Sequence, residues 1–298
     1  MLNRWRCLRE RGWAEITAAE YAKVWQRFGG SVATFPPVVE RLAELAEIPV
    51  RYLGWRQAED WIAAIPVWGR HLALSKAALK ASGKKGLYDL GNAEIILPVA
   101  AGAQVPLRHT ARYLSARHEA DFLGLKQQRE QLALAKAPEE LSSKFRYNQR
   151  RELRLLREAG GSVRPVGDFP PADLATIYSE LFERRWGFPA TGAARMAEVF
   201  TRLREWMSGA LIFMDGAPIA MQVLYRVEAP QWISVEYING GVDPQTRAFS
   251  PGSVLSFLNL QAAWEDARAR EKPLRYSFGR VDRDYKSRWC RAVPVFQV

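Results

Sequence analysis

The sequence predicts an α/β protein with α+β character, in which mixed and mostly antiparallel sheets are flanked by helices. The first observation is a hairpin signal, because Asp215-Gly216 joins apolar runs at 210–214 and 217–227. A third strand at 231–239 extends this hairpin to an antiparallel meander. The second observation is that helical periodicity precedes the strands in both halves of the chain.

The front half opens with a helix that has a clear start and end. Thr17 and Glu20 form a capping box, apolar residues follow at helical spacing, and Gly29-Gly30 ends the helix. A double proline then opens a second helix. This second helix is expected at 36–46. After it we expect strands at 50–55 and 60–68, a basic loop at 80–86, and a helix at 119–135.

The back half is expected to repeat this order before the meander. In chain order we expect a helix at 145–159, a strand at 162–166, and helices at 171–186 and 191–207. After the meander, a helix beginning near Ser250 and a strand at 274–278 complete the half.

The two halves also resemble each other in detail. The segments VWQRFGG (24–30) and LFERRWG (181–187) each close a helix with an aromatic residue and glycine, and the strands that follow keep a nearly constant spacing. A duplication explains this spacing, and the alternative is a coincidence of common helix–strand order. We therefore predict two domains, residues 1–140 and residues 141–298.

The charge balance indicates an anionic partner. The formal net charge is +11 and the pI is about 9.8, which suits nucleic acid, a phosphorylated cofactor or an acidic membrane surface. The alternative is that the charge only keeps the protein soluble. The two cysteines and three histidines lack the spacing of a disulfide framework or a metal site, so no metal is expected. No secretory signal or apolar span is visible, and a cytoplasmic protein that can lie on a membrane surface is expected.

A helix start near residue 250 is the candidate cofactor-binding site. Ser250 can cap the helix, Pro251 suits its first turn, and Gly252 lets a ligand approach the backbone. Free N–H groups at such a start, including that of Ser253, attract phosphate, and Arg247 can grip a second phosphate. The alternative is an ordinary capped helix that packs on a sheet.

The loop DYKSRW (284–289) supplies the candidate catalytic residues. Lys286 and Tyr285 can stabilise a developing oxyanion or orient a carbonyl. Asp282 or Asp284 can accept a proton from an attacking amine or hydroxyl. The alternative is a salt-bridged surface loop in which the two aspartates pair with neighbouring arginines. Glu236 on the third meander strand is a further carboxylate, which we expect to face solvent.

A basic helix face is the candidate anion-binding surface. Its arginines recur at helical spacing, so they share one side of the helix, and few acidic residues compensate them. Such a face can follow a phosphate backbone or anionic lipid headgroups, and the alternative is a solvated face. The residues are Arg146, Arg150, Arg154 and Arg157.

These motifs carry a resemblance to a known family. The order SPGSVL (250–255), YSFG (276–279) and YKSRW (285–289) resembles the C-terminal half of the GNAT-like FemAB and CelD proteins. RYNQRRELRLLREAGG (146–161) resembles their linker helix. With VWQRFGGSVATFPPVVERL and IPVRYLGW at the front, most of the chain resembles the Mig family of antimicrobial-peptide resistance proteins. The usual glycine-rich pyrophosphate signature is reduced here to a single Pro-Gly.

The resemblance implies tandem GNAT-like domains on the cytoplasmic side of the bacterial inner membrane, and survival of cationic antimicrobial peptides. The donor it implies is an aminoacyl-tRNA or an acyl-CoA. We therefore predict a transferase that modifies a cell-envelope component, with an inner-membrane lipid or a lipopolysaccharide precursor as acceptor. The N-terminal domain is expected to support the other domain. The alternative is a non-catalytic protein that binds membrane or nucleic acid, such as tRNA, through residues 145–159.

Overall fold

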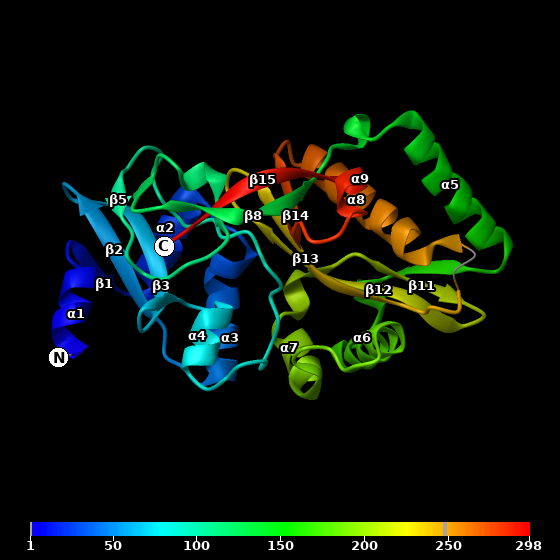
Figure 1. Cartoon of the computed structure of the whole chain (residues 1–298), viewed down its shortest axis with the longest axis horizontal. Coiled ribbons are helices and arrows are strands. Elements are labelled where there is room, and N and C mark those ends of the chain that lie inside the picture. The colour runs from blue at the N-terminus through cyan, green and yellow to red at the C-terminus, as the bar shows by residue number, and fades with distance from the viewer. Residues whose placement is uncertain (1, 247–248) are drawn as a thin grey trace.

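The structure is a computed structural model that describes residues 2–246 and 249–298 (Figure 1). Its α-helices are α1 (Leu2–Arg9), α2 (Ala18–Phe28), α3 (Pro36–Ala46), α4 (Lys76–Ala81), α5 (Ser143–Glu158), α6 (Pro171–Trp186), α7 (Met196–Arg202), α8 (Pro251–Ala269) and α9 (Lys286–Trp289). Its strands up to residue 140 are β1 (Trp13–Ile16), β2 (Arg51–Gln57), β3 (Asp60–Trp68), β4 (His71–Leu72), β5 (Val105–Pro106), β6 (Leu114–Ser115), β7 (Phe122–Leu123) and β8 (Lys126–Ala135). The later strands are β9 (Ser162–Pro165), β10 (Met207–Ser208), β11 (Ala210–Met214), β12 (Ala217–Glu228), β13 (Ile233–Val242), β14 (Leu274–Arg280) and β15 (Cys290–Gln297).

A small antiparallel sheet in the order β1-β2-β3-β4 lies in the N-terminal half of the chain. The predicted capping box at Thr17 is confirmed: the Thr17 hydroxyl accepts a hydrogen bond from the Glu20 backbone N–H, and the Glu20 carboxylate accepts one from the Thr17 N–H. The apolar side of the helix then buries Tyr21 and Trp25 completely. The local sequence therefore determines both where α2 starts and which side it buries.

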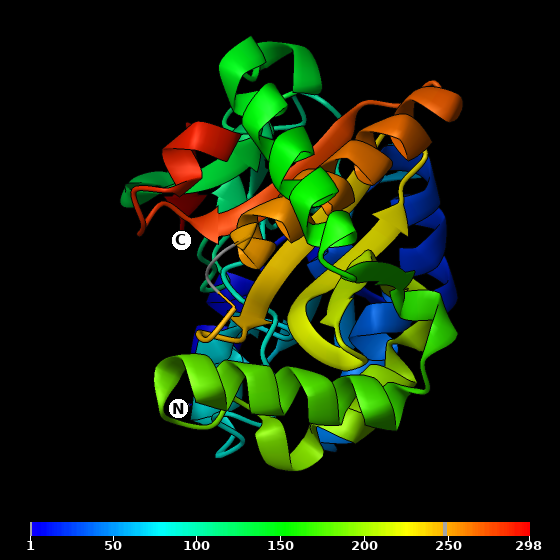
Figure 2. The same ribbon diagram turned by 90° about the vertical axis from the view of Figure 1, so that its right-hand side faces the viewer.

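The second sheet runs in the order β6-β15-β8-β14-β13-β12-β11-β9, with β10 paired to β12. All its neighbouring strands are antiparallel except β13 and β14, which run parallel. Figure 2 shows α5 and α8 on one side of this sheet and α6 on the other. The predicted fold class, mixed and mostly antiparallel sheets flanked by helices, is confirmed.

The same order of elements occurs in both halves. In the front half β1, α2, α3, β2 and β3 follow one another, and β2 pairs with both strands. In the back half β9, α6, α7, β11 and β12 occur in the same order around β11, with the two-residue strand β10 inserted before β11. This repetition supports the duplication hypothesis. The domain boundary at residue 140 stays a prediction, and β8, which precedes it, lies between β14 and β15 of the large sheet (Figure 1).

The helix predicted at 119–135 is wrong. Residues 122–123 and 126–135 form β7 and β8 instead, and β8 pairs along its length with β15. Its sequence KQQREQLALA contains good helix formers, so intrinsic propensity favours a helix. The open edges of β14 and β15 satisfy its backbone groups on both sides, and this tertiary pairing overrides the propensity.

Two predictions for the back half are confirmed and a third is confirmed in part. The Asp215-Gly216 hairpin is confirmed, with both turn residues at positive φ as a type I′ turn requires. The helix at 171–186 is confirmed as α6. The helix predicted at 191–207 is shorter, because only Met196–Arg202 is α-helical and short 3₁₀ turns flank it.

Candidate functional site

The main cavity opens where two parallel strands separate. β13 and β14 pair only between Ile233–Glu236 and Leu274–Ser277. Beyond that point β13 continues along β12 with a bulge, since Val223 is opposite Asn239 and Leu224 is opposite Tyr237. A bulge bends its strand, and β14 meanwhile follows β8. The strands therefore diverge. A cavity of about 490 Å³ lies along β13 beyond this point, and its wall includes Tyr237 and Gly240 of β13 and Tyr285 and Trp289, which follow β14 in the chain. Among the described residues, none of β14 itself lines it.

The start of α8 forms one wall of this cavity, and a buried polar network fixes its position. The Gln222 amide donates to the Ser256 hydroxyl at 2.7 Å and accepts from Asn259 at 2.9 Å. Asn259 in turn accepts a hydrogen bond from the Ala210 backbone N–H at 2.9 Å. α8 is therefore tied to β11 and β12, and its first turn is held at the cavity.

Two glycines at the end of β13 shape the opposite wall. A Cβ on Gly240 would lie 2.7 Å from the Tyr237 hydroxyl, so only glycine allows that hydroxyl to lie where it does. A Cβ on Gly241 would lie 2.6 Å from the Leu181 Cβ and 2.8 Å from the Phe182 backbone nitrogen. The glycine pair thus lets α6 approach closely and leaves Tyr237 in the cavity wall.

The predicted phosphate-binding residues that the structure describes line this cavity together. Ser250, Gly252 and Ser253 all contribute to its wall, whereas Arg247 lies outside the described residues. The expectation that the Ser250 side chain caps α8 is wrong, because Ser250 is at φ 45° and makes no side-chain capping bond. Its carbonyl instead accepts hydrogen bonds from the N–H groups of Ser253 and Val254.

Those bonds reduce the number of backbone N–H groups at the start of α8 that are free to bind a ligand. Pro251 has no N–H, and the Ser253 and Val254 N–H groups are already bonded. Within residues 249–298, Gly252 is therefore the first-turn residue whose N–H has no intramolecular partner. This is fewer free N–H groups than the sequence motif suggests, and further positive charge must come from arginine side chains.

The predicted catalytic loop divides into residues that face the cavity and residues that do not. Tyr285 lines the cavity and is 41% exposed, and burial of its ring raises the pKa of Tyr285. Asp284 is exposed. Asp282 pairs with Lys286 at 2.9 Å and with Arg280 at 3.8 Å. The salt-bridged alternative is thus met only in part, because Asp284 forms no ion pair with a described residue and the closer partner of Asp282 is a lysine.

Lys286 occupies a different place from the one its predicted role requires. Its side chain is buried, and its ammonium donates to the carbonyls of Phe278 at 2.8 Å and Arg280 at 2.7 Å in addition to the Asp282 ion pair. These three partners match the three N–H groups of a lysine. The ammonium therefore holds the loop after β14 in shape, and this geometry does not support polarisation of a substrate carbonyl.

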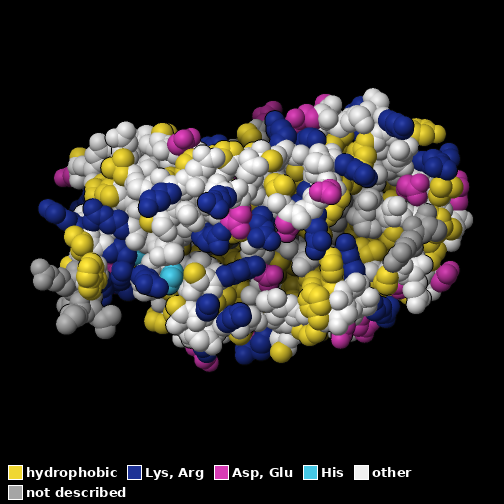
Figure 3. All heavy atoms as spheres, viewed as in Figure 1, with side chains coloured by type: hydrophobic (Ala, Val, Ile, Leu, Met, Phe, Trp, Pro, Cys, Tyr) yellow, Lys and Arg dark blue, Asp and Glu magenta, His cyan; other side chains and the backbone are white. Residues whose placement is uncertain are grey.

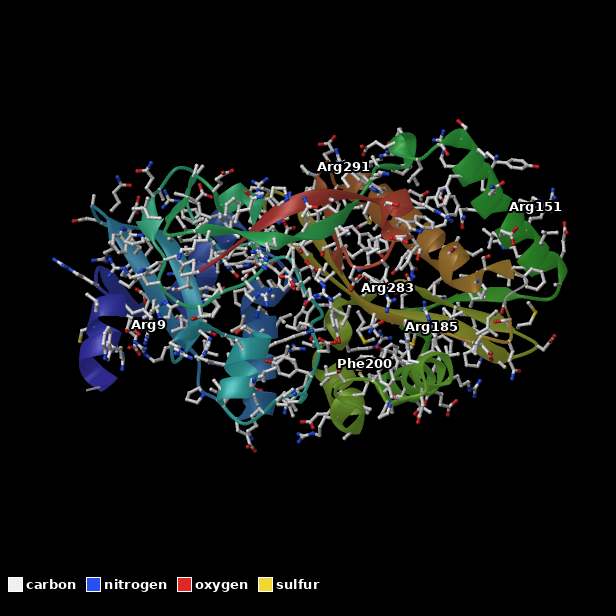
Figure 4. The ribbon with its side chains drawn as sticks, in the orientation of Figure 1. Arg9, Arg151, Arg185, Phe200, Arg283 and Arg291 are labelled. Carbon is white, nitrogen blue, oxygen red and sulfur yellow. The ribbon has the colours of Figure 1, made fainter. Side chains whose placement is uncertain are left out.

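Two arginines that the sequence prediction missed lie at the rim of the cavity. Arg185 of α6 lines the cavity, and both Arg185 and Arg283 lie over the ring of Trp186, at 4.8 and 5.5 Å from its centroid. Figure 4 shows them together where α6 faces the loop before α9. Figure 3 shows Lys and Arg side chains gathered around a hollow in the middle of this face. The rim can therefore attract an anionic ligand.

Other missed residues had a recognisable signal. Gln222 is a polar residue inside the apolar run of β12, and Gly240-Gly241 interrupts the end of β13. A buried polar residue in a strand and a glycine pair at its end both indicate a close approach of another group.

The basic helix is separate from the cavity. Arg150, Arg154 and Arg157 are exposed on α5, whereas Arg146 is half-buried and donates to the Pro138 carbonyl at 3.2 Å. α5 packs on α8 through Leu153 and Leu156, and none of its residues lines the cavity. The four arginines therefore do not act as one set, and a surface of three exposed arginines remains as the anion-binding candidate.

The expectation that Glu236 faces solvent is wrong. Its carboxyl is 1% exposed and accepts a hydrogen bond from the Glu94 backbone N–H at 3.0 Å. Burial, together with the nearby Glu94 carboxylate, raises the pKa of Glu236 well above its usual range. Glu94 itself forms a bidentate ion pair with Arg275. This buried cluster joins the two halves and lies outside the cavity wall.

Two negative findings concern the chain within 2–246 and 249–298. Over these ranges no helix is both long enough and apolar enough to cross a membrane. The same residues contain no group of three or more His, Cys, Asp and Glu side chains arranged to hold a metal ion.

Comparison with known proteins settles the family. The Mig-14 family model matches residues 35–298. The chain belongs to the Mig-14 family. No curated protein matches its sequence.

The fold has solved counterparts. One is the crystal structure of FemX, with a TM-score of 0.58, 13% identity, and coverage of 96% of this chain and 96% of that one. Another is L-PGS from Bacillus licheniformis, with a TM-score of 0.51, 11% identity, and coverage of 95% and 91%. A tandem GNAT protein from the clavulanic acid pathway also aligns, at 11% identity with a TM-score of 0.46 over 96% and 97%. This member of the Mig-14 family thus shares its fold with FemX and L-PGS.

Proposed function

We propose that this Mig-14 family protein transfers an acyl or aminoacyl group from a phosphate-bearing donor to an amine or hydroxyl acceptor. The observation that carries the proposal is the cavity along β13 beyond the point where β13 and β14 diverge, which has the start of α8 in one wall and Arg185 at its rim. Separated strands expose the backbone of a sheet interior to a ligand. The helix start and the arginine supply the donors that phosphate requires.

The chemistry follows from what the cavity offers. The acceptor nucleophile attacks the donor carbonyl, a new amide or ester bond forms, and the donor thioester or ester bond breaks. The acceptor loses a proton and the leaving thiol or hydroxyl gains one. Tyr285 and Tyr237 present hydroxyls in the wall, and burial keeps the pKa of Tyr237 above its usual value, so both can donate hydrogen bonds at neutral pH. Positioning and oriented donors supply most of the rate acceleration.

The donor is proposed to be an aminoacyl-tRNA or an acyl-CoA. The reduced Pro-Gly turn and the single free N–H of Gly252 offer less grip for a pyrophosphate than a glycine-rich loop does. The exposed arginines of α5 and the similarity in fold to FemX and L-PGS support the aminoacyl-tRNA. Contacts with a polynucleotide depend steeply on salt, so the two donors can be separated experimentally.

Calorimetric titration tests the donor site. We expect binding of acetyl-CoA, a long-chain acyl-CoA, or charged tRNA to be lost in Gly252→Asp, because the new carboxylate faces the phosphate. Gly167→Asp is the matched control. Gly167 has open space around it and does not line the cavity, so this substitution adds the same negative charge outside the cavity. If wild type binds none of the three donors, or if both variants bind like wild type, the proposal is wrong.

The salt dependence tests the role of α5. If it contacts tRNA phosphates, replacing Arg150, Arg154 and Arg157 by Gln should reduce the slope of log K against log salt by about 2–3. An unchanged slope would remove α5 from the donor site. If the triple variant binds no membrane or nucleic acid while Gly252→Asp retains every cellular effect, the non-catalytic alternative is favoured.

The acceptor is proposed to be a lipid or glycan of the cell envelope, reached from the cytoplasmic surface of the inner membrane. A transferred aminoacyl group adds positive charge, and this would weaken binding of cationic peptides and so contribute to resistance. The aromatic side chains of Trp186 and Phe188, 37% and 56% exposed beside the arginine rim, suit a membrane surface. Identical masses of envelope lipids from cells with and without the protein would contradict this part.

A further inference from the structure

A second cavity lies in the N-terminal half and, among the described residues, shares no lining residue with the donor cavity. It has a volume of about 250 Å³ and lies between α4 and the segment that follows it. Its wall is formed largely by apolar side chains, among them Leu72, Leu74, Leu79, Leu90 and Leu97, all of which are otherwise buried. Apolar cavities of this kind stay poor in water and favour an apolar ligand.

The wall of this second cavity contains two unusual features. Leu74 and Tyr113 both have positive φ angles, 62° and 58°, which are uncommon for residues with a side chain and recur at ligand sites. Tyr88 is 3% exposed, and its hydroxyl has no hydrogen-bond partner among the residues of the described chain. An unused buried donor in an apolar wall fits a ligand that carries an ester or carboxyl oxygen.

Lysines lie at and near the wall of the second cavity: Lys76 lines it, Lys80 follows one turn later on the same helix, and Lys85 follows in the next loop. α4 places Ala77 and Leu79 at the cavity, and the three lysines are exposed. Lys80 and Lys85 form no ion pair with any described side chain, and Lys76 pairs only with Asp89, at 3.1 Å. An apolar interior with Lys76 in its wall and Lys80 one helical turn further suits an apolar chain with an anionic head.

The second cavity is adjacent to the donor cavity. Gly91 lines the second cavity, and a Cβ on Gly91 would lie 3.5 Å from the backbone of Ile238 in β13. Ile238 follows Tyr237, which lines the donor cavity. Figure 1 shows the segment after α4 passing between the front half and α7. A ligand held in the second cavity therefore lies one strand away from the donor.

We propose that this second cavity binds one acyl chain of an anionic phospholipid, with the headgroup phosphate at Lys76, Lys80 and Lys85. The lysines neutralise the phosphate, and the apolar wall buries the chain. Binding of the lipid does not depend on the transfer reaction. That the bound lipid is the acceptor rests on the proposed function, and it gives the N-terminal half a substrate-binding role in place of a purely supporting one.

Displacement of dansylated undecanoic acid measures this binding directly. We expect lysophosphatidylglycerol, kept below its micelle concentration, to displace the probe, with affinity rising about three- to fourfold for each added methylene until the cavity is full. Lysophosphatidylcholine of equal chain length should bind at least about fivefold more weakly, because its headgroup has no net charge for the lysines to neutralise. A free fatty acid that binds better than either lipid would overturn the choice of phospholipid.

Matched variants locate the site. Ala77→Trp should weaken probe binding at least about tenfold by filling part of the cavity, whereas Ala81→Trp, on the same helix but outside the wall, should not. Lys80→Glu with Lys85→Glu lies on the surface and should remove the preference for the anionic lipid without affecting folding.

Three outcomes overturn the proposal: no probe binding, equal binding by the two tryptophan variants, or an unchanged lipid preference in the charge variant. Gly252→Asp should leave probe binding intact. Lipid binding can therefore fail or stand independently of the donor site.

Discussion

Lys286→Met tests whether the buried ammonium shapes the site or takes part in the reaction. Wild-type Lys286 donates to two backbone carbonyls, of Phe278 and Arg280, and each hydrogen bond to a charged group contributes about 1.5–3 kcal/mol. The ion pair with Asp282, whose side chain is 34% exposed, adds at most about 1 kcal/mol after solvent screening. Methionine fills similar volume but satisfies neither carbonyl. The free energy of unfolding should therefore fall by about 3–7 kcal/mol.

Thermal unfolding and hydrogen exchange measure this effect. The melting temperature should fall by roughly 5–10 °C, and the amides between residues 278 and 289 should lose protection. Arg288→Met is the matched control, because Arg288 is exposed on the same short helix and should change the stability by less than about 0.5 kcal/mol. If Lys286→Met melts within about 1 °C of wild type and yet abolishes transfer, the ammonium acts on the substrate, and our structural reasoning is refuted.

Three further predictions follow from the packing and the ionisation of buried groups. Gly240→Ala should weaken donor binding, measured by calorimetry, because it displaces the Tyr237 hydroxyl. Gly241→Ala should instead lower the free energy of unfolding by about 1–3 kcal/mol, measured by thermal melting, because it pushes α6 away. Equal effects of the two variants in both assays would contradict this. Burial lowers the pKa of His109 to about 4, so the unfolded state binds more protons between pH 6.5 and 4, and stability should fall by up to about 3 kcal/mol as pH drops through that window. Denaturant unfolding at several pH values should show a smaller slope in His109→Gln than in wild type, and burial also lowers the pKa of His71, which accounts for part of what remains. Burial raises the pKa of Cys290 to about 12, so iodoacetamide at pH 8 should modify the exposed Cys7 alone, as mass spectrometry would show, and rapid labelling of native Cys290 would contradict the packing.

The elements that the sequence predicted well are those whose information is local. The capping box of Thr17, the Asp215-Gly216 turn and the glycine after Trp186 each act on neighbouring residues, so pattern alone identifies α2, the hairpin and α6. β8 was mispredicted because its residues favour a helix, and only the distant strands β14 and β15 make it extended. No local pattern reports a pairing across that distance.

In the candidate site, too, residues of short local motifs were predicted, whereas residues placed by the tertiary fold were not. Ser250, Gly252, Ser253 and Tyr285 belong to short motifs, and the structure brings them to one cavity. Whether the Lys286 side chain faces that cavity or the backbone depends on how the loop after β14 folds back on itself, which residue types do not reveal. Arg185 and Gln222 reach the cavity from elements that only the tertiary fold places beside α8.

Transfer of a labelled group tests the central claim most directly. Purified protein would be incubated with radiolabelled aminoacyl-tRNA or acyl-CoA and an envelope extract, and label in the lipid and glycan fractions would be counted. We predict incorporation by wild type and by Gly167→Asp, and none by Gly252→Asp, because the altered residue lies in the donor cavity. Absence of incorporation with every donor, or equal incorporation by the two variants, would contradict a transferase site in the cavity between β13 and the start of α8.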